Sequence, residues 1–255
     1  MLRRINRYEL KYLVHASEYP RLVDDLLHFM SPDPYGDKNG FYRIVSLYYD
    51  GPSYPCYRSK VDGIFMRRKV RLRIYPGEDI EATTQGCVEI KQRYNRTVQK
   101  QRLFLPLKHA EALLDGDADI PLQDPRDMHT AEHIRFLIRT LGLRPACIVS
   151  YRRRAFQGSR YESGMRLTFD LDLCGRIDAL CVSEEAHNHP FLPLDWLIME
   201  VKVNERIPDW MTSLLARHEC RLYRVSKYCL CLAQELRRRQ FSLEHKEVFY
   251  GLYHS

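Results

Sequence analysis

The sequence predicts an α+β fold: a closed, mainly antiparallel eight-stranded β-barrel flanked by helices. Eight or nine short segments with alternating apolar and polar residues recur along the chain, most of them joined by turns or by a single helix, which favours antiparallel neighbours. At least six of these segments have one apolar and one charged face, so the apolar faces need a covering layer that helices can provide. Because no repeat or long linker interrupts the chain, we expect one domain over residues 1–255.

The first half of the chain is expected to contain most of the strands. Ser17 is a suitable N-cap, and apolar residues recur with helical spacing from Leu22 to Met30, which predicts a helix there. The following segment, SPDPYGDKNG, is rich in turn-forming residues and predicts a loop. Strands are expected at residues 5–14, 41–50, 66–75, 87–94 and 97–105.

The second half begins with helices and then returns to strands. Two helices are expected at residues 107–114 and 129–141, the second ending at Gly142, since glycine is common just after a helix. The remaining expected strands lie at residues 146–156, 165–172, 176–182 and 195–203, and the remaining helices at 208–219 and 226–239.

The overall charge points to a polyanionic partner. Lys and Arg number 40 against 33 Asp and Glu, so the net charge is +7 and the pI about 9.0. Nucleic acid, anionic lipid and phosphate compounds all fit such an excess, and charge alone does not choose among them. A hydrophobic fraction of 45% excludes a disordered chain.

Cysteine usage and the N-terminus bear on location. The eight cysteines are spread along the chain without a CxxC pair, which favours reduced, mostly buried thiols. The N-terminus lacks the features of a secretory signal, and no run approaches the roughly 20 apolar residues that a membrane span needs. We therefore expect a cytoplasmic protein without a membrane segment.

The charged faces of the strands carry the functional signal. In RRKVRLRIY, Lys69, Arg71 and Arg73 alternate with three aliphatic residues, so they share one face of a strand. One such strand is an ordinary sheet with one wet face. Repeated over six strands, these faces could line the inside of a barrel, where many like charges are costly without a polyanion. A chain of phosphates is a natural occupant, because Arg side chains suit phosphate oxygens.

The same alternation defines the other charged faces. They comprise Arg7, Glu9 and Lys11; Glu89, Lys91 and Arg93; Tyr151 and Arg153; Arg166, Thr168, Asp170 and Asp172; and Glu200 and Lys202. Asp170 and Asp172 have two interpretations. They could help to bind a second metal, or they could form ion pairs with Arg166 or Arg153, and we prefer the pairing.

Nine motifs follow one another over nearly the whole chain: RYELKYL, SLYYD, RKVRLRIYP, VEIKQR, KQRLFL, SYRRRAFQ, RLTFDLDL, LIMEVKVN and VSKY. As an ordered set they resemble the VTC domain, the catalytic part of the vacuolar transporter chaperone polyphosphate polymerase, in the triphosphate tunnel metalloenzyme superfamily. The resemblance implies a tunnel-shaped barrel with a basic interior. It also implies that the terminal phosphoryl group of ATP is transferred to a growing polyphosphate chain, with Mn²⁺ or Mg²⁺ as cofactor.

The resemblance also implies roles for single residues. Arg71 and Arg73 would grip the nucleotide's phosphates and stabilise transfer, with Lys202 in the lumen beside Glu200, the metal carboxylate. Further phosphate contacts would come from Lys11, Lys91, Lys100, Tyr151, Arg153 and Arg166, while Ser226 and Lys227 would close one mouth of the tunnel. Lys60 is an additional candidate with a loose register. The implied partners are ATP and inorganic polyphosphate. The pI makes a nucleic-acid-binding role a third possibility, but its best candidate, the RRRQ run at residues 237–240, is better explained as a solvated helix end, so no nucleic acid is expected.

One departure from the superfamily bears on the activity. Hydrolytic relatives begin with ExExK, whereas this chain has RYELK, with Arg7 at the position of the first glutamate. Losing that carboxylate weakens metal binding and removes a group that could orient water, which favours a polymerase over a metal-dependent triphosphatase. A non-catalytic module that binds polyphosphate or nucleotide is a further alternative, against which the retained Lys11, Glu200 and Lys202 argue.

Overall fold

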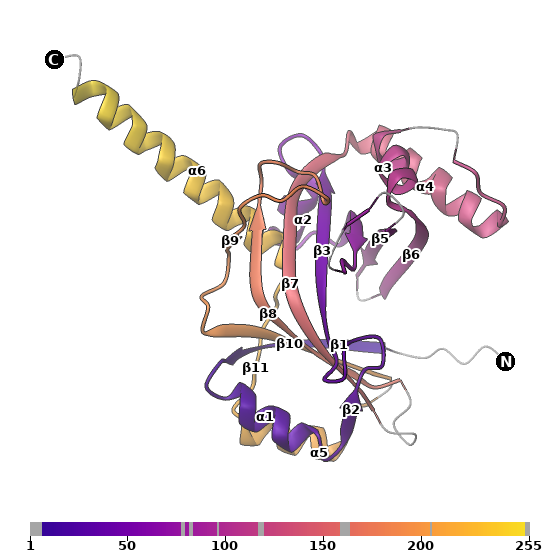
Figure 1. Cartoon of the computed structure of the whole chain (residues 1–255), viewed down its shortest axis with the longest axis vertical. Coiled ribbons are helices and arrows are strands. Elements are labelled where there is room, and N and C mark those ends of the chain that lie inside the picture. The colour runs from indigo at the N-terminus through magenta and orange to yellow at the C-terminus, as the bar shows by residue number, and fades with distance from the viewer. Residues whose placement is uncertain are drawn as a thin grey trace. The chain divides into compact units, whose positions relative to one another are not determined.

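The computed structural model describes the backbone of residues 7–252 apart from 78–79, 82–83, 96, 117–119, 159–163 and 205, and within that range the side chains of residues 8–241. The described residues form eleven strands and six helices (Figure 1). In chain order these are β1 (Arg7–His15), α1 (Tyr19–Leu26), β2 (Met30–Pro32), β3 (Phe41–Asp50), α2 (Pro55–Val61), β4 (Met66–Ile74), β5 (Gln85–Tyr94), β6 (Thr97–Pro106), α3 (Leu107–Asp115), α4 (Pro125–Leu141), β7 (Arg144–Gly158), β8 (Arg166–Arg176), β9 (His189–Pro190), β10 (Trp196–Asn204), α5 (Asp209–Arg217), β11 (Arg221–Leu222) and α6 (Lys227–Leu252).

The strands form one large antiparallel sheet, which confirms the α+β prediction. Its order is β11-β1-β10-β8-β7-β3-β4-β5-β6, with β2 paired to β7 and β9 to β8. In the described part of the chain this path is open, so the prediction of a closed, eight-stranded barrel was wrong. The strand count differs because β2, β9 and β11 have only two or three residues, too few to show an alternating pattern.

The chain divides into two compact units. The first comprises residues 1–43, 151–173 and 192–226, and the second comprises residues 44–150, 174–191 and 227–255. Strands β3, β7 and β8 contribute residues to both units. Each unit has its own buried core. The expectation of a single domain stays a prediction.

The core of the first unit lies between its strands and helices α1 and α5. Alternate residues of β10, among them Met199 and Val201, belong to this core as predicted, although Glu200 on the other face is also buried. Figure 1 shows α1 and α5 side by side. The rings of Phe29 and Trp210 are stacked with 4.4 Å between their centroids. The helix α1 begins after Glu18 and not after Ser17, whose hydroxyl instead bonds to a neighbouring histidine ring.

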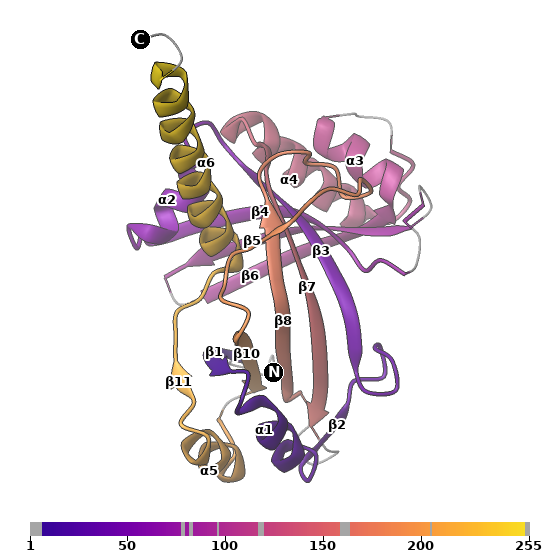
Figure 2. The same ribbon diagram turned by 60° about the vertical axis from the view of Figure 1, so that its left-hand side comes forward.

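The core of the second unit lies between β4, β5 and β6 and helices α3 and α4 (Figure 2). Leu72, Val88 and Leu103 stand opposite one another on the three strands and are fully buried. The helix α4 begins at Pro125, four residues before the predicted start, because the Asp124 carboxylate accepts a hydrogen bond from its first turn. It ends before Gly142, as predicted, and this glycine has a φ of 57°.

The strand predicted at residues 176–182 was wrong, since β8 ends at Arg176 and the chain then follows an irregular path. The Arg176 guanidinium donates to the carbonyl oxygens of Ala179, Cys181 and Glu184 at 2.9, 2.8 and 3.1 Å. These carbonyl groups therefore bond to a side chain instead of a neighbouring strand.

The helix α2 was not predicted, because the side chain that accepts hydrogen bonds from its first turn lies five residues before the helix begins. Asp50, at the end of β3, accepts hydrogen bonds from the backbone N–H groups of Cys56 and Tyr57 at 2.8 and 2.9 Å. All eight cysteines of the chain are free thiols. Over the described ranges, no helix has both the length and the apolar character that crossing a bilayer demands.

Candidate functional site

Strands β4, β5 and β6 of the second unit pair in register, so alternate side chains form rows across the three strands. Four rows make up what we call the cationic face: Arg67–Arg93–Val98, Lys69–Lys91–Lys100, Arg71–Glu89–Arg102 and Arg73–Cys87–Phe104. Eight of these twelve positions are Lys or Arg, and Glu89 is the sole acidic residue among them. The cationic face therefore carries a large excess of positive charge.

The row of three lysines is the plainest sign of an anion-binding surface. Lys69, Lys91 and Lys100 are direct cross-strand partners. Like charges directly opposite one another destabilise a sheet, and neighbouring strands lie about 4.8 Å apart. An anion with charge on successive units would stabilise such a row by neutralising its neighbouring ammonium groups.

Glu89 holds two arginines of the cationic face in place. Its carboxylate accepts hydrogen bonds from Arg71 Nη2 at 2.7 Å and from Arg102 Nε at 2.9 Å, and the residue is 3% exposed. Burial acts to raise the pKa of Glu89, but Arg71, Arg102 and Arg73 outweigh it and lower the pKa to about 2. Glu89 is therefore ionised at neutral pH and fixes the orientation of both guanidinium groups.

The neighbouring strand β3 adds hydroxyl groups to two of the rows. Arg71 Nη1 donates to Tyr48 Oη at 3.0 Å, and Arg73 Nε donates to Ser46 Oγ at 3.3 Å. Burial acts to raise the pKa of Tyr48, but Arg71, Arg73 and Lys69 together lower it below its ordinary value. The strong positive potential at Tyr48 is a further mark of an anion-binding surface.

The first turn of α6 is attached beside the cationic face. The Tyr228 hydroxyl donates a short hydrogen bond to Asp50, and its ring stacks on Tyr48 with 5.1 Å between centroids. Lys69 Nζ lies over the same ring at 5.1 Å from its centroid. Lys227 begins this helix and is almost fully buried. The role expected for Ser226 and Lys227 at a tunnel mouth stays a prediction.

The first unit holds a second charged group, which we call the carboxylate–lysine cluster: Glu9, Lys11, Glu200 and Lys202. Lys11 Nζ lies 3.2 Å from Glu9 Oε1 and 3.3 Å from Glu200 Oε2, and Lys202 Nζ also contacts Glu200. Burial acts to lower the pKa of Lys11, but Glu200 and Glu9 raise it above its ordinary value. In contrast to the cationic face, the cluster contains equal numbers of positive and negative groups.

The remaining predicted residues of the first unit form ion pairs of their own. Arg153 binds Asp170 with two hydrogen bonds, Nε to Oδ1 at 2.6 Å and Nη2 to Oδ2 at 2.9 Å, and Asp170 is fully buried. The ion pair that we preferred for Asp170 is thus confirmed with Arg153. Arg153 Nη2 also donates to Tyr151 Oη at 3.4 Å, and Arg166 pairs with Asp33 at 2.7 Å.

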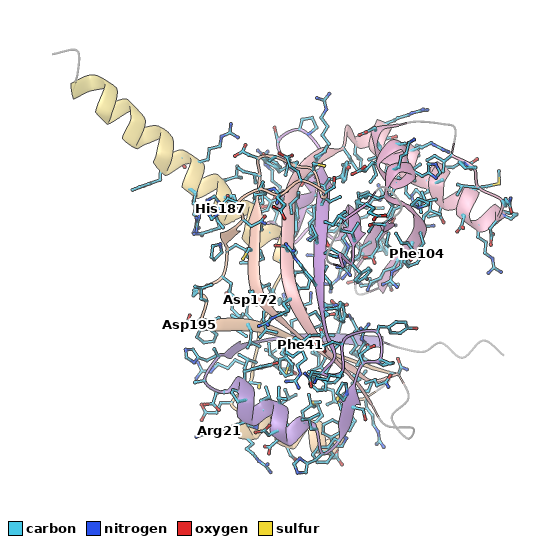
Figure 3. The ribbon with its side chains drawn as sticks, viewed as in Figure 1. Arg21, Phe41, Phe104, Asp172, His187 and Asp195 are labelled. Atoms are coloured by element: carbon cyan, nitrogen blue, oxygen red, sulfur yellow. The ribbon has the colours of Figure 1, made fainter. Side chains whose placement is uncertain are left out.

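Asp172, labelled in Figure 3, pairs with Arg152 at 3.2 Å, and both side chains are more than half exposed. The predicted partners of Asp172, Arg153 and Arg166, pair elsewhere. The backbone of Asp172 has a φ of 55°, so the regular alternation on which that pairing was predicted is broken at this residue.

The carboxylate–lysine cluster has the donor types that a divalent cation needs. Glu9 and Glu200 supply carboxylate oxygens, and Thr168, the cross-strand partner of Glu200, has a buried hydroxyl without a hydrogen-bond partner in the described structure. Mg²⁺ usually takes one or two carboxylates and completes its shell with water and substrate phosphates. The described residues contain no group of three His, Cys, Asp or Glu arranged for a metal. Glu9 and Glu200 would therefore suit a cation whose remaining ligands are water molecules and the phosphate oxygens of a substrate.

Most of the predicted site residues fall into these groups. The cationic face contains Arg71, Arg73, Lys91 and Lys100, and the carboxylate–lysine cluster contains Lys11, Glu200 and Lys202. Outside these two groups, Tyr151 and Arg153 lie on β7, Arg166 lies on β8 beside β10, and Lys60 lies on α2. Residues without a predicted role are Ser46, Tyr48, Lys69, Arg102 and Thr168. Alternation within the segment KQRLFL could have identified Arg102, which shares a face with Lys100.

The fold and these two groups define an α+β protein whose large antiparallel sheet carries charged strand faces. The VTC domain model matches residues 6–236, and the chain belongs to this family. The resemblance seen in the ordered motifs is therefore confirmed. Membership of the family supports a role with polyphosphate or nucleotides.

Comparison with solved structures found distant likenesses. A candidate adenylate cyclase from Bacillus halodurans is 13% identical, with a TM-score of 0.49 over 86% of this chain and 92% of that chain. A Pyrococcus horikoshii protein is 11% identical, with a TM-score of 0.44 over 91% and 99%. A chain of the Schizosaccharomyces pombe Mediator head module is 11% identical, with a TM-score of 0.46 over 86% and 98%. TM-scores below 0.5 carry no argument about function, and a search of curated proteins found no match.

Proposed function

We propose that the protein is a polyphosphate polymerase that transfers the terminal phosphoryl group of ATP to a growing inorganic polyphosphate chain. A terminal oxygen of the chain would attack the γ-phosphorus, and the bond from that phosphorus to the β–γ bridging oxygen would break, releasing ADP. The observation that carries this proposal is the cationic face, with its row of Lys69, Lys91 and Lys100. This surface suits a substrate that is charged on every unit.

The residues present match what phosphoryl transfer needs. Positioning and charge neutralisation supply most of the catalysis in this reaction. Arg71, held by Glu89 and Tyr48, would neutralise charge on the transferring phosphate without reorienting, and Arg73 would act beside it. The attacking phosphate is already anionic at neutral pH, so no general base is required. Lys11 and Lys202 would bind phosphate in the first unit.

A divalent cation, Mn²⁺ or Mg²⁺, would act as a Lewis acid on phosphate oxygens when bound. We assign Glu200 and Glu9 to hold it, with Thr168 beside them. In this assignment Lys11 and Lys202 offset the carboxylates that they contact. A metal-dependent triphosphatase remains the main alternative, because the same groups would also bind a triphosphate for attack by water.

The products of ATP turnover test the proposal. Purified protein is incubated with ATP and Mn²⁺, with and without a short polyphosphate primer, while ADP, polyphosphate and orthophosphate are measured together. We expect ADP to rise with an equal gain in chain phosphate. Orthophosphate in place of chain phosphate would assign a triphosphatase, and tight binding without turnover would leave a binding module.

Two variants connect the activity with the cationic face. Arg71→Ala should lower kcat by about a hundredfold, as expected when a group that stabilises transition-state charge is removed. Lys108→Ala on α3 is the matched control, since Lys108 is exposed and lies outside the cationic face. Equal activity of the two variants would contradict the assignment. We also propose a cytoplasmic location, which stable membrane association on cell fractionation would overturn.

A further inference from the structure

An exposed aromatic pair lies at one end of the cationic face. Phe65 and Tyr94 are 54% and 59% exposed, and their rings meet edge to face with 5.0 Å between centroids. The residues on either side of Phe65, Ile64 and Met66, are also exposed, at 50% and 38%. An apolar group of this kind on the surface of a protein commonly marks a binding site.

The pair is continuous with the strands of the cationic face. Phe65 immediately precedes β4, and the Asn95 N–H donates to the Phe65 carbonyl at 3.0 Å, which extends the pairing of β4 with β5 by one step. Phe65 therefore follows the alternation that places Arg67 and Lys69 on the cationic face. Tyr94 ends β5 opposite Met66, so the same register assigns it to the opposite face of the sheet, and its ring meets Phe65 at the end of the two strands.

The separation between the aromatic pair and the lysine row suits a nucleotide. Lys69 lies four positions after Phe65, and at about 3.3 Å per residue this is about 13 Å along the strand. An extended nucleoside triphosphate covers such a distance between its terminal phosphates and its base. Flat aromatic rings are also the side chains on which nucleobases stack.

We propose that Phe65 and Tyr94 form the base-binding platform for the nucleotide whose phosphates contact the cationic face. The inference rests on the proposed function and adds to it the position of the base. The platform makes no hydrogen bonds to base edges in this proposal, so it selects a nucleoside triphosphate over inorganic tripolyphosphate without reading the identity of the base. GTP should therefore bind nearly as well as ATP.

The test compares two ligands that differ in the nucleoside. Binding of ATP and of inorganic tripolyphosphate is measured by calorimetry on the full chain and on its Phe65→Ala, Phe65→Tyr and Phe136→Ala variants. Phe136 is 59% exposed on α4 and lies outside the cationic face, so it is a matched control. Phe65→Ala should weaken ATP binding by about tenfold and leave tripolyphosphate binding unchanged. Phe65→Tyr and Phe136→Ala should bind ATP as the unaltered chain does.

Other outcomes separate the two proposals. If Phe65→Ala weakens both ligands equally or neither, or if Phe136→Ala weakens ATP binding as much as Phe65→Ala does, the platform is not at Phe65. If Phe65→Ala instead dissociates a dimer and leaves ATP affinity unchanged, the aromatic pair is a contact between copies of the chain. If the unaltered chain binds ATP but not tripolyphosphate, the proposed function fails, whatever the variants show. If it binds neither ligand, both proposals fail.

Discussion

Replacing Glu89 with glutamine should remove one of the main electrostatic supports of the second unit. Glutamine keeps the shape of the side chain but carries no charge toward Arg71 and Arg102. The difference between the ordinary pKa of 4.5 and the value of about 2 in the folded protein corresponds to about 3 kcal/mol of stability at neutral pH. At 3% exposure, Glu89 is screened little by solvent. We therefore expect Glu89→Gln to lower the free energy of unfolding by about 3 kcal/mol.

The pH dependence of this loss separates charge from packing. The folded pKa lies below the unfolded one, so the unfolded chain binds more protons between them and the contribution of Glu89 falls as the pH falls. It is fully present above about pH 4.5 and lost as the pH approaches about 2. We expect urea unfolding from about pH 7 to about pH 3 to show that the difference in the free energy of unfolding between the unaltered chain and Glu89→Gln becomes smaller as the pH falls.

A matched control and a clear contrary result make the experiment decisive. Glu132, exposed on α4, should tolerate the same Glu→Gln change within about 0.5 kcal/mol. A gap for Glu89→Gln that stays constant with pH would refute the electrostatic reasoning, because it would mean that packing alone accounts for the loss. A gap below about 1 kcal/mol at neutral pH would refute the magnitude.

Three further predictions follow from the ion pairs and the exposed charges. Asp170→Asn should cost about 3–5 kcal/mol in urea unfolding, because it leaves Arg153 buried without its charged partner; a loss below about 1 kcal/mol would contradict this. Tyr228→Phe should cost about 1–3 kcal/mol, because it removes a donor from buried Asp50; an unchanged thermal midpoint would exclude that role. Tripolyphosphate affinity should fall as KCl is raised, because salt screens the exposed cations; salt-independent calorimetric affinity would place the ligand elsewhere.

The long strands of this fold were predictable from the sequence. The strand β4 was expected at residues 66–75 and is found at Met66–Ile74, because the strict alternation from Lys69 to Ile74 distinguishes a strand from a helix. The short strands β2, β9 and β11 were not predictable. Their two or three residues are strands only because a partner lies beside them, and single-sequence patterns do not contain that information.

Interactions between residues that are not adjacent in the chain account for the other differences between the predicted and the observed elements. Residues 176–182 have the β-branched and apolar composition of a strand, yet Arg176 binds three backbone carbonyls further along the chain and holds them in a loop. In the same way, α2 depends on Asp50 five residues before its first turn. Such a cap lies outside the usual N-cap position, where sequence motifs are sought.

For the candidate site, alternation identified the charged faces but not the pairing within them. It placed Arg71 and Glu89 on charged faces of separate strands, whereas their ion pair depends on the β4–β5 register. Thr168 was likewise placed on a charged face, but its position beside Glu200 became apparent only from the β8–β10 register. A shift of one residue in either register would turn these side chains to the opposite face.

The different charge balance of the two groups has a consequence for activity. The cationic face has eight basic residues and one acidic residue among its twelve positions, so it attracts phosphate without help from a metal. The carboxylate–lysine cluster is balanced, so a bare phosphate gains little there unless a cation first offsets Glu9 and Glu200. Affinity for polyphosphate should thus depend mainly on the cationic face. The requirement of turnover for a metal should depend on the carboxylate–lysine cluster. Under the proposed function, a chain with Arg7 in place of a carboxylate would still bind polyphosphate, because binding would not depend on the lost group.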